Sequence, residues 1–127
     1  MAALDLGEKL IGVAITDAQG GFVVHRSTIA RRSGAHDRAA LAAVLDAHPG
    51  ATVVVGLPLL PDGTEGAQVI RTRRWAAALL AHRPERIVFR DERLTTAAAR
   101  AAGAAPAALD AWSAEVLLRD FLAAPGR

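Results

Sequence analysis

The fold follows from residues 2–14, which read Ala2-Ala3-Leu4-Asp5-Leu6-Gly7-Glu8-Lys9-Leu10-Ile11-Gly12-Val13-Ala14. This segment is typical of an apolar strand, a tight turn and a second apolar strand. A carboxylate inside an apolar strand is costly unless it is paired, hydrogen-bonded or bound to a cation. Asp5 is therefore either a solvated residue at a strand end or one member of a site built from several acids.

Further strands follow on the C-terminal side. The segment Ile11–Thr16 alternates large and small residues, and Phe22–Ile29 returns after a turn. Their short connections predict an antiparallel arrangement of three strands. Thr52–Leu57 and Ile87–Phe89 are short apolar runs rich in β-branched residues, which is typical of strands covered on both faces.

Helices are expected between and after these strands, from capping residues and apolar periodicity. Leu41, Val44 and Leu45 are expected on the inner side of the first helix. The expected helices are one capped by Ser33 that runs to about Ala47, one capped by Asp62 or Thr64 that runs to about Ala81, a short one from Thr95 to Gly103, and one from Pro106 to about Leu122.

The order of these elements predicts a single α/β domain over residues 1–127. Strand–helix–strand units favour parallel pairing with right-handed crossovers. We therefore expect a mixed five-stranded sheet, with three antiparallel strands followed by two parallel ones and with helices on both faces.

Composition narrows the class of protein. The 127 residues are 52% hydrophobic and include no Cys, so disulfides and thiolate chemistry are excluded. No apolar run approaches a membrane span, and the chain enters a strand at once, so we expect a cytoplasmic protein. Lys9 is the single Lys among 15 basic residues, which indicates either a compositional bias or a preference for the bidentate phosphate ligand Arg.

Three further acids, outside the first strand, join Asp5 as candidate site residues. Asp91 and Glu92 end the last predicted strand, and Asp110 begins the last helix. On helical spacing Asp110 shares a stripe with Ala114 and Leu117, so this stripe should face the sheet. Asp110 is then either an inward ligand or an acid that stabilises the helix N-terminus.

Acids from separate elements at one sheet edge suit Mg²⁺ or Mn²⁺, which prefer carboxylate oxygens and retain waters. Two such ions about 4 Å apart can activate water and stabilise the leaving oxygen in phosphodiester cleavage. A zinc site is not expected, because Cys is absent and the four His residues are scattered: His25, His36, His48 and His82.

Several of these segments resemble the YqgF family in order along the chain. Besides the Asp5–Ala14 segment, the resemblance includes Val55-Gly56-Leu57-Pro58, Asp62-Gly63-Thr64-Glu65-Gly66, Asp91-Glu92-Arg93-Leu94-Thr95-Thr96 and Asp110-x-x-Ser113-Ala114. It implies a RuvC-like protein with an RNase H-like fold. It also implies a Holliday junction resolvase or a nuclease that matures the 5′ end of the small-subunit rRNA precursor.

The resemblance implies that Asp5, Asp91 and Asp110 are the catalytic acids that bind metal. Glu92 is either a partner of these ligands or the ligand in place of Asp91, because adjacent strand residues point to opposite faces. The chain departs from the family at Leu10, where a basic residue is usual. It also departs at Leu60-Pro61 and in the Ala-rich segment 103–108, and all three changes remove polar or basic groups near the expected substrate path.

The candidate residues for substrate contact are marked less clearly by the sequence than the acids are. Lys9, Arg93 and the cluster of Arg71, Arg73 and Arg74 could contact phosphates, although an arginine cluster on a helix is also typical of a solvated face. Gly56 would allow a sugar-phosphate to approach the backbone, or it merely serves the strand-to-loop turn.

We therefore expect a nuclease that uses Mg²⁺ or Mn²⁺ on branched DNA or precursor rRNA, with a homodimer if the substrate is a four-way junction. The alternatives are a non-catalytic nucleic-acid-binding module of the same fold and a fragment of an ATPase with two such domains.

Overall fold

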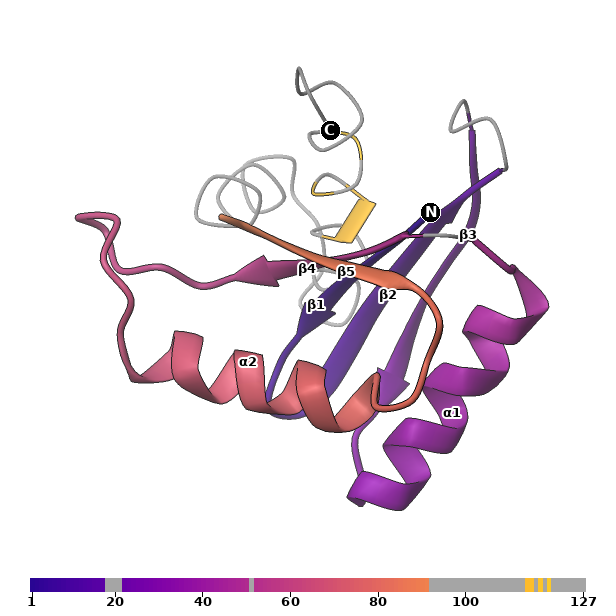
Figure 1. The fold of residues 1–127 in the computed structure, drawn as a ribbon, viewed down its shortest axis with the longest axis horizontal. Coiled ribbons are helices and arrows are strands. Elements are labelled where there is room, and N and C mark those ends of the chain that lie inside the picture. The colour runs from indigo at the N-terminus through magenta and orange to yellow at the C-terminus, as the bar shows by residue number, and fades with distance from the viewer. Residues whose placement is uncertain (18–21, 51, 92–113, 116, 118, 120–127) are drawn as a thin grey trace.

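A computed structural model describes residues 1–17, 22–50, 52–91, 114, 115, 117 and 119. Its centre is a five-stranded sheet with the strand order β3-β2-β1-β4-β5, which places β1 in the middle (Figure 1). The strands are β1 (Ala2–Leu6), β2 (Leu10–Thr16), β3 (Val23–Ala30), β4 (Thr52–Leu57) and β5 (Arg86–Asp91).

Strand directions agree with the order predicted from sequence. β1 pairs antiparallel with β2, and β2 pairs antiparallel with β3. β4 then pairs parallel with both β1 and β5, because a helix precedes each of the two later strands. The expected mixed sheet is confirmed, and β5 is longer than the predicted Ile87–Phe89.

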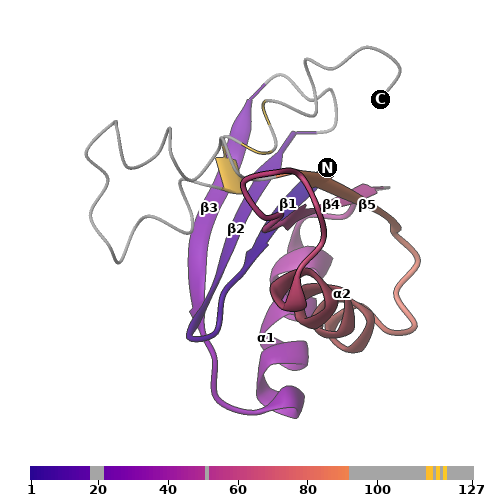
Figure 2. The ribbon, with the colours of Figure 1, turned by 90° about the vertical axis from the view of Figure 1, so that its left-hand side faces the viewer.

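The helices α1 (Gly34–Ala47) and α2 (Ala67–Leu79) lie on the same side of the sheet, as Figure 2 shows. Ser33 caps α1 as expected, because its hydroxyl accepts a hydrogen bond of 3.1 Å from the His36 N–H. This side holds the larger core cluster, in which Leu41 and Leu45 are buried and Val44 packs beside them.

A smaller cluster covers the opposite face of the sheet. There Ala3, Ala14 and Val54 pack with Ala114 and Leu117, which are 0% and 1% exposed. The expectation that the stripe of the last helix faces the sheet is confirmed for these two residues. The remaining parts of the expected helices 95–103 and 106–122 lie outside the described residues.

The start of α2 corrects the sequence interpretation. Neither Asp62 nor Thr64 caps the helix; Gly66 occupies the N-cap and provides no side-chain hydrogen bond. Asp62 Oδ1 instead accepts hydrogen bonds from the N–H (2.9 Å) and hydroxyl (2.6 Å) of Thr64, so the loop uses the oxygen that a cap would need. Ile70 is 54% exposed despite its apolar side chain, because the buried side of α2 consists of Val69, Thr72, Ala76 and Leu79.

Candidate functional site

Asp5 lies in the central strand and faces away from the two helices. Its neighbours Leu4 and Leu6 belong to the core cluster under α1 and α2, whereas Ala3 belongs to the opposite cluster. Since side chains alternate along a strand, Asp5 shares the face of Ala3. Its exposed fraction is only 9%, so the carboxylate is buried within the sheet.

Glycines occupy the positions beside Asp5 on both neighbouring strands. Gly12 of β2 pairs directly with Asp5. On β4, Val55 pairs with Leu4, so Gly56 follows next to Asp5. Neither of these two positions places a side chain beside the carboxylate, so neither strand itself blocks the approach of a group to Asp5.

Asp91 occupies the exposed end of β5. Phe89 packs with the core under the helices and Val88 with the opposite cluster, so alternation assigns Asp91 to the helix side. Arg90, which sequence reasoning did not select, pairs with Gly56 and therefore lies on the Asp5 face. The structure consequently places Asp5 and Asp91 on different faces of the sheet. Along the strands, Asp91 lies one residue beyond the position that is level with Asp5.

The other predicted site residues, Glu92, Arg93 and Asp110, lie outside the described residues. Within the described part of the chain, no three His, Cys, Asp or Glu side chains form a group that could hold a metal ion. A metal centre around Asp5 thus depends on acids beyond that part. Its one described donor is a carboxylate, the ligand type that Mg²⁺ and Mn²⁺ prefer.

Lys9 lies in the turn that follows Asp5. The Gly7 N–H donates a 2.9 Å hydrogen bond to the Leu10 carbonyl, so Glu8 and Lys9 form a two-residue loop. Lys9 is exposed, and no ion-pair partner for it is present among the described residues. Its ammonium group is therefore available to an external anion.

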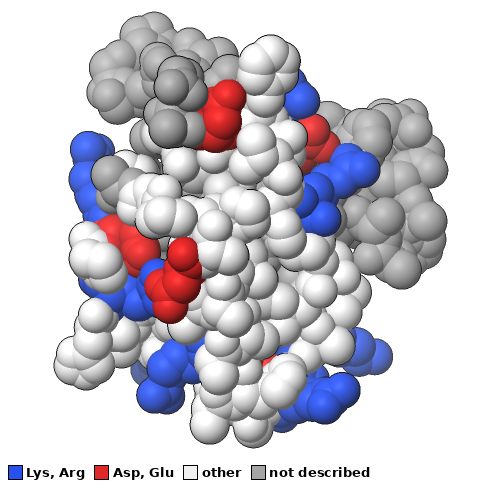
Figure 3. Space-filling view, turned by 90° about the vertical axis from the view of Figure 1, so that its right-hand side faces the viewer, with Lys and Arg blue, Asp and Glu red and all other residues white. Residues whose placement is uncertain are grey.

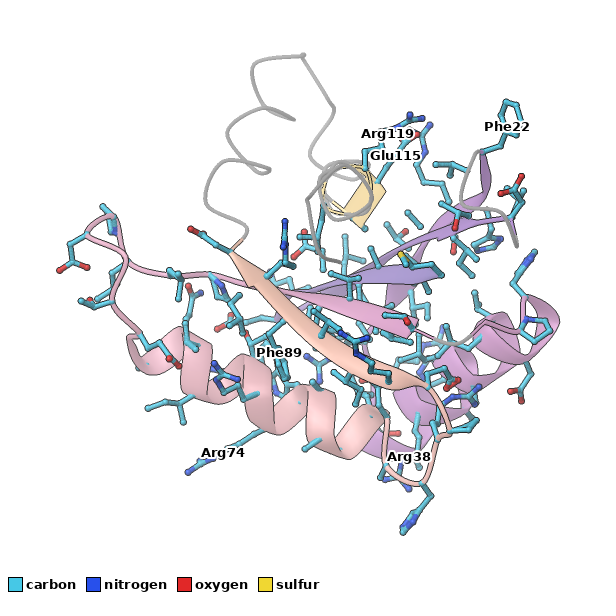
Figure 4. All side chains as sticks on the ribbon, turned by 45° about the horizontal axis from the view of Figure 1, so that its top comes forward. Phe22, Arg38, Arg74, Phe89, Glu115 and Arg119 are labelled. Atoms are coloured by element: carbon cyan, nitrogen blue, oxygen red, sulfur yellow. The ribbon has the colours of Figure 1, made fainter. Side chains whose placement is uncertain are left out.

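The predicted arginines on α2 differ from one another in their surroundings. Arg71 forms an ion pair with Glu8 and lies over the Trp75 ring at 5.8 Å. Arg73 pairs with Glu65 at 3.2 Å and lies over Phe89. Arg74 has no such partner in the described ranges and points outward from α2, away from the sheet (Figure 4).

Arg31 and Asp37, which sequence reasoning missed, support the turn that carries Lys9. Arg31 Nη1 donates a 3.0 Å hydrogen bond to the Gly7 carbonyl, and its Nε donates to Asp37 Oδ2 at 3.3 Å. Asp37 is 3% exposed and also accepts a 2.9 Å hydrogen bond from the Arg32 N–H. The sequence offered only a weak signal, an acid in the first turn of a helix.

Burial alone would raise the pKa of Asp37. Hydrogen bonds from His36, the Arg32 backbone and Arg31, together with the charge of Arg31, outweigh that effect and hold this pKa below its ordinary value. Asp37 is therefore ionised at neutral pH and pairs with the Arg31 guanidinium.

A solvent-facing hollow of about 570 Å³ lies at the far side of β3. Arg26 reaches Glu115 across it at 2.8 Å, and Glu115 also pairs with Arg119 at 3.0 Å. Figure 4 shows Phe22, Glu115 and Arg119 at this end of the molecule. The hollow lies at the Val23 end of β3, whereas the Lys9 turn lies near the other end, where Ala30 pairs with Leu10. The two are therefore separated by the length of β3.

The described helices are 14 and 13 residues long, and neither is long and apolar enough to cross a membrane.

Comparisons with known proteins relate the sequence to a family of nucleases and resolvases. A family model described as "RuvX: Holliday junction resolvase" matches residues 1–124. The "Putative pre-16S rRNA nuclease" of Ruegeria pomeroyi is 41% identical over 102 residues, which cover 80% of this chain and 66% of that protein. The protein of the same name from Myxococcus xanthus is 43% identical over 96 residues, which cover 76% of this chain and 64% of the relative. The chain thus spans just under two thirds of the length of these relatives.

A solved structure shares the fold. The structure entitled "T. thermophilus RuvC in complex with Holliday junction substrate" matches with a TM-score of 0.65 and covers 99% of this chain and 96% of that chain. A second structure, of Thermus thermophilus RuvC, matches with a TM-score of 0.59. Both are 14% identical to this chain, so they establish the RuvC-like, RNase H-like fold expected from the sequence.

Proposed function

Because this chain belongs to the family described as RuvX, Holliday junction resolvase, we propose that it is a nuclease. It hydrolyses phosphodiester bonds of a structured nucleic acid and depends on Mg²⁺ or Mn²⁺. The observation that carries this proposal is the position of Asp5, a 9% exposed carboxylate in the central strand with glycines beside it on both sides. A buried carboxylate needs a cation or hydrogen-bond donors to remain ionised.

The proposed metal ligands are Asp5, Asp110 and one residue of the Asp91–Glu92 pair. Strand alternation favours Glu92 over Asp91, because Asp91 lies on the helix side of β5 and Asp5 on the other. Two divalent ions held by these carboxylates would supply an activated water and stabilise the leaving oxygen. The chain itself contributes a sheet that fixes Asp5 and excludes bulk water from one side of it.

Binding of the nucleic-acid backbone is proposed for Lys9 and Arg74, the two exposed predicted cations without an ion-pair partner in the described part of the chain. Arg93 and the backbone at Gly56 remain candidates for the same role. Arg71 is better explained as support for the turn, because Glu8 already pairs with its guanidinium.

The substrate is either a four-way DNA junction or precursor rRNA, since both present the same phosphodiester. The family description refers to the junction, and the curated relatives are called pre-16S rRNA nucleases. Symmetric cleavage of a junction requires two active sites and therefore a homodimer, whereas trimming one RNA end requires one site.

The experiment compares cleavage of a four-way junction and a precursor rRNA fragment side by side, in Mg²⁺, Mn²⁺ and EDTA. Wild type is expected to cleave one of them only with the metal, and Asp5→Asn to abolish cleavage without a change in melting temperature larger than a few degrees. Asp46→Asn is the matched control, because it removes an exposed carboxylate on α1 and is expected to retain activity. Metal-independent binding of either substrate without cleavage would favour a non-catalytic binding module instead.

A further inference from the structure

We propose that Arg31 is a positioning residue that holds Lys9 where Lys9 contacts a phosphate of the bound nucleic acid. The inference rests on the proposed function. It assigns a role to a residue that lies outside the acidic site and that makes its contacts with the turn between β1 and β2.

The turn is short and does not have the backbone conformation that suits a tight hairpin. Glu8 and Lys9 are its two loop residues, and neither has a positive φ. Two-residue hairpin loops normally adopt primed turns with positive φ, because only these match the twist of the strands. Contacts from outside the hairpin therefore stabilise a turn that is less favourable than a primed one.

Arg31 supplies that support at two points. Its backbone N–H donates a 2.8 Å hydrogen bond to the Lys9 carbonyl. Its side-chain Nη1 donates a 3.0 Å hydrogen bond to the Gly7 carbonyl. One residue thus holds the backbone on both sides of Glu8, and the direction of the Lys9 side chain depends on that backbone.

The Arg31 side chain is itself fixed by two helices. From α1, Asp37 accepts from its Nε at 3.3 Å; from α2, the Trp75 ring lies 4.3 Å beneath the guanidinium carbon. A guanidinium held by a carboxylate and an aromatic face has little rotational freedom. The turn is therefore attached to the helical layer rather than only to the sheet.

Arg31 acts through Lys9 rather than on the phosphate directly. Its side chain is only 16% exposed; its Nε and Nη1 already donate to Asp37 and Gly7, and the Trp75 ring covers one face of the guanidinium. Lys9 is exposed and has no ion-pair partner in the described residues. The removal of either residue should therefore cost the same single phosphate contact.

The test measures binding of a four-way DNA junction and of a precursor rRNA fragment across a salt series, in EDTA so that no cleavage occurs. Each phosphate contact contributes about 0.9 to the slope of log K against log salt on duplex DNA. We expect Lys9→Met and Arg31→Met each to lower the slope by about one contact. The double variant should lower it no further.

Arg83→Met is the matched control. Arg83 has the same 16% side-chain exposure and also sits in an ion-pair network, with Asp46 and Glu85, but it does not contact the turn. It should leave the slope at the wild-type value even though it removes one positive charge. If Arg31→Met does not fold, Arg31→Lys replaces it, because Lys retains the charge but cannot make all three contacts.

An additive loss in the double variant would overturn the inference, because Arg31 would then contact phosphate itself. A wild-type slope for Arg31→Met, or for Lys9→Met, would overturn it as well while leaving the proposed nuclease intact. Wild-type protein that binds neither nucleic acid would overturn the proposed function, and the inference with it.

Discussion

Asp5 stands in a position where an acid costs free energy unless something compensates its charge. The four nearest core residues in β1 are apolar, and they explain why this strand forms the middle of the sheet. Gly12 and Gly56 lie beside Asp5 on the two neighbouring strands. They add no side chain beside the carboxylate, and they have a lower strand propensity than larger residues.

Gly56→Ala tests whether that space matters. The backbone of Gly56 has no positive φ, so the backbone conformation there is compatible with Ala. Its methyl group would lie on the Asp5 face, and we expect about tenfold weaker Mn²⁺ affinity, or about 1.4 kcal/mol. Titration calorimetry measures this effect. Gly34→Ala is the control, because no atom lies within 4 Å of an added Cβ there; equal affinity in both variants would contradict the account.

Asp37 should make the stability of the protein depend on pH at the acid end. Its pKa is lowered in the folded state, so it contributes stability that is fully present above the unfolded pKa of about 3.9. That contribution is lost as the pH falls through the lowered pKa of the folded protein. Asp37→Asn should cost about 2 kcal/mol at pH 7, because it weakens a buried charged hydrogen-bond network.

Urea unfolding of wild type and Asp37→Asn at pH 7 and at pH 2.5 checks this prediction. The difference between the two proteins should narrow at the lower pH, where Asp37 of the wild type becomes protonated. A difference that stays constant between the two pH values would show that the carboxylate charge does not stabilise the fold.

At the scale of elements, periodicity predicted the sheet and both described helices, because apolar alternation and capping act locally. The start of α2 was not predictable in this way, since Asp62 and Thr64 bond to each other instead of to the helix. The Arg31–Asp37 pair was missed because its importance comes from Gly7, a residue distant in sequence. Side-chain contacts between residues that are distant in sequence are difficult to predict from local sequence patterns.

The candidate site was predictable only in part for a related reason. Asp5 was identifiable because an acid in an apolar run is conspicuous. The choice between Asp91 and Glu92 depends on which face of β5 each side chain occupies, and that requires the register with β4. The core packing of Phe89 and Val88 assigns Asp91 to the helix side by alternation, whereas Glu92 lies outside the described residues.

Strand alternation predicts different effects for the two neighbouring acids. Glu92→Gln should reduce metal-dependent cleavage by at least a hundredfold, whereas Asp91→Asn should retain activity within about tenfold, a difference of at least 1.4 kcal/mol. Single-turnover rates at saturating Mn²⁺ measure both. The reverse order would mean that β5 twists at its end and that Asp91 is the ligand.

The net charge of the whole molecule is small, +2, but some basic side chains have acidic partners and others have none among the described residues. Acids lie beside the basic side chains over much of the face shown in Figure 3, while basic side chains with few acidic neighbours gather along its lower edge. Arg26, Arg31 and Arg83 have carboxylate partners, whereas exposed Arg38 and Arg74 have none within the described ranges. Distribution, rather than net charge, therefore indicates where a polyanion binds.

Arg74 and its neighbour Arg73 provide a matched pair for this argument. Arg74→Ser should weaken nucleic-acid binding and lower the salt slope by about 0.9, the value of one phosphate contact on duplex DNA. Arg73→Ser removes the same charge from the next residue, but Arg73 is engaged by Glu65 and Phe89, so its slope should stay close to wild type. Equal slopes for the two variants would assign both arginines to a solvated helix face.

The proposed nuclease activity depends on a divalent cation bound at Asp5. Titration of Mn²⁺ into wild type and into Asp5→Asn, followed by calorimetry on protein of verified fold, tests this most directly. We predict saturable binding to wild type and a loss of at least a hundredfold in affinity, about 2.7 kcal/mol, in the variant. Identical Mn²⁺ binding by the two proteins would contradict the assignment of Asp5 as a metal ligand.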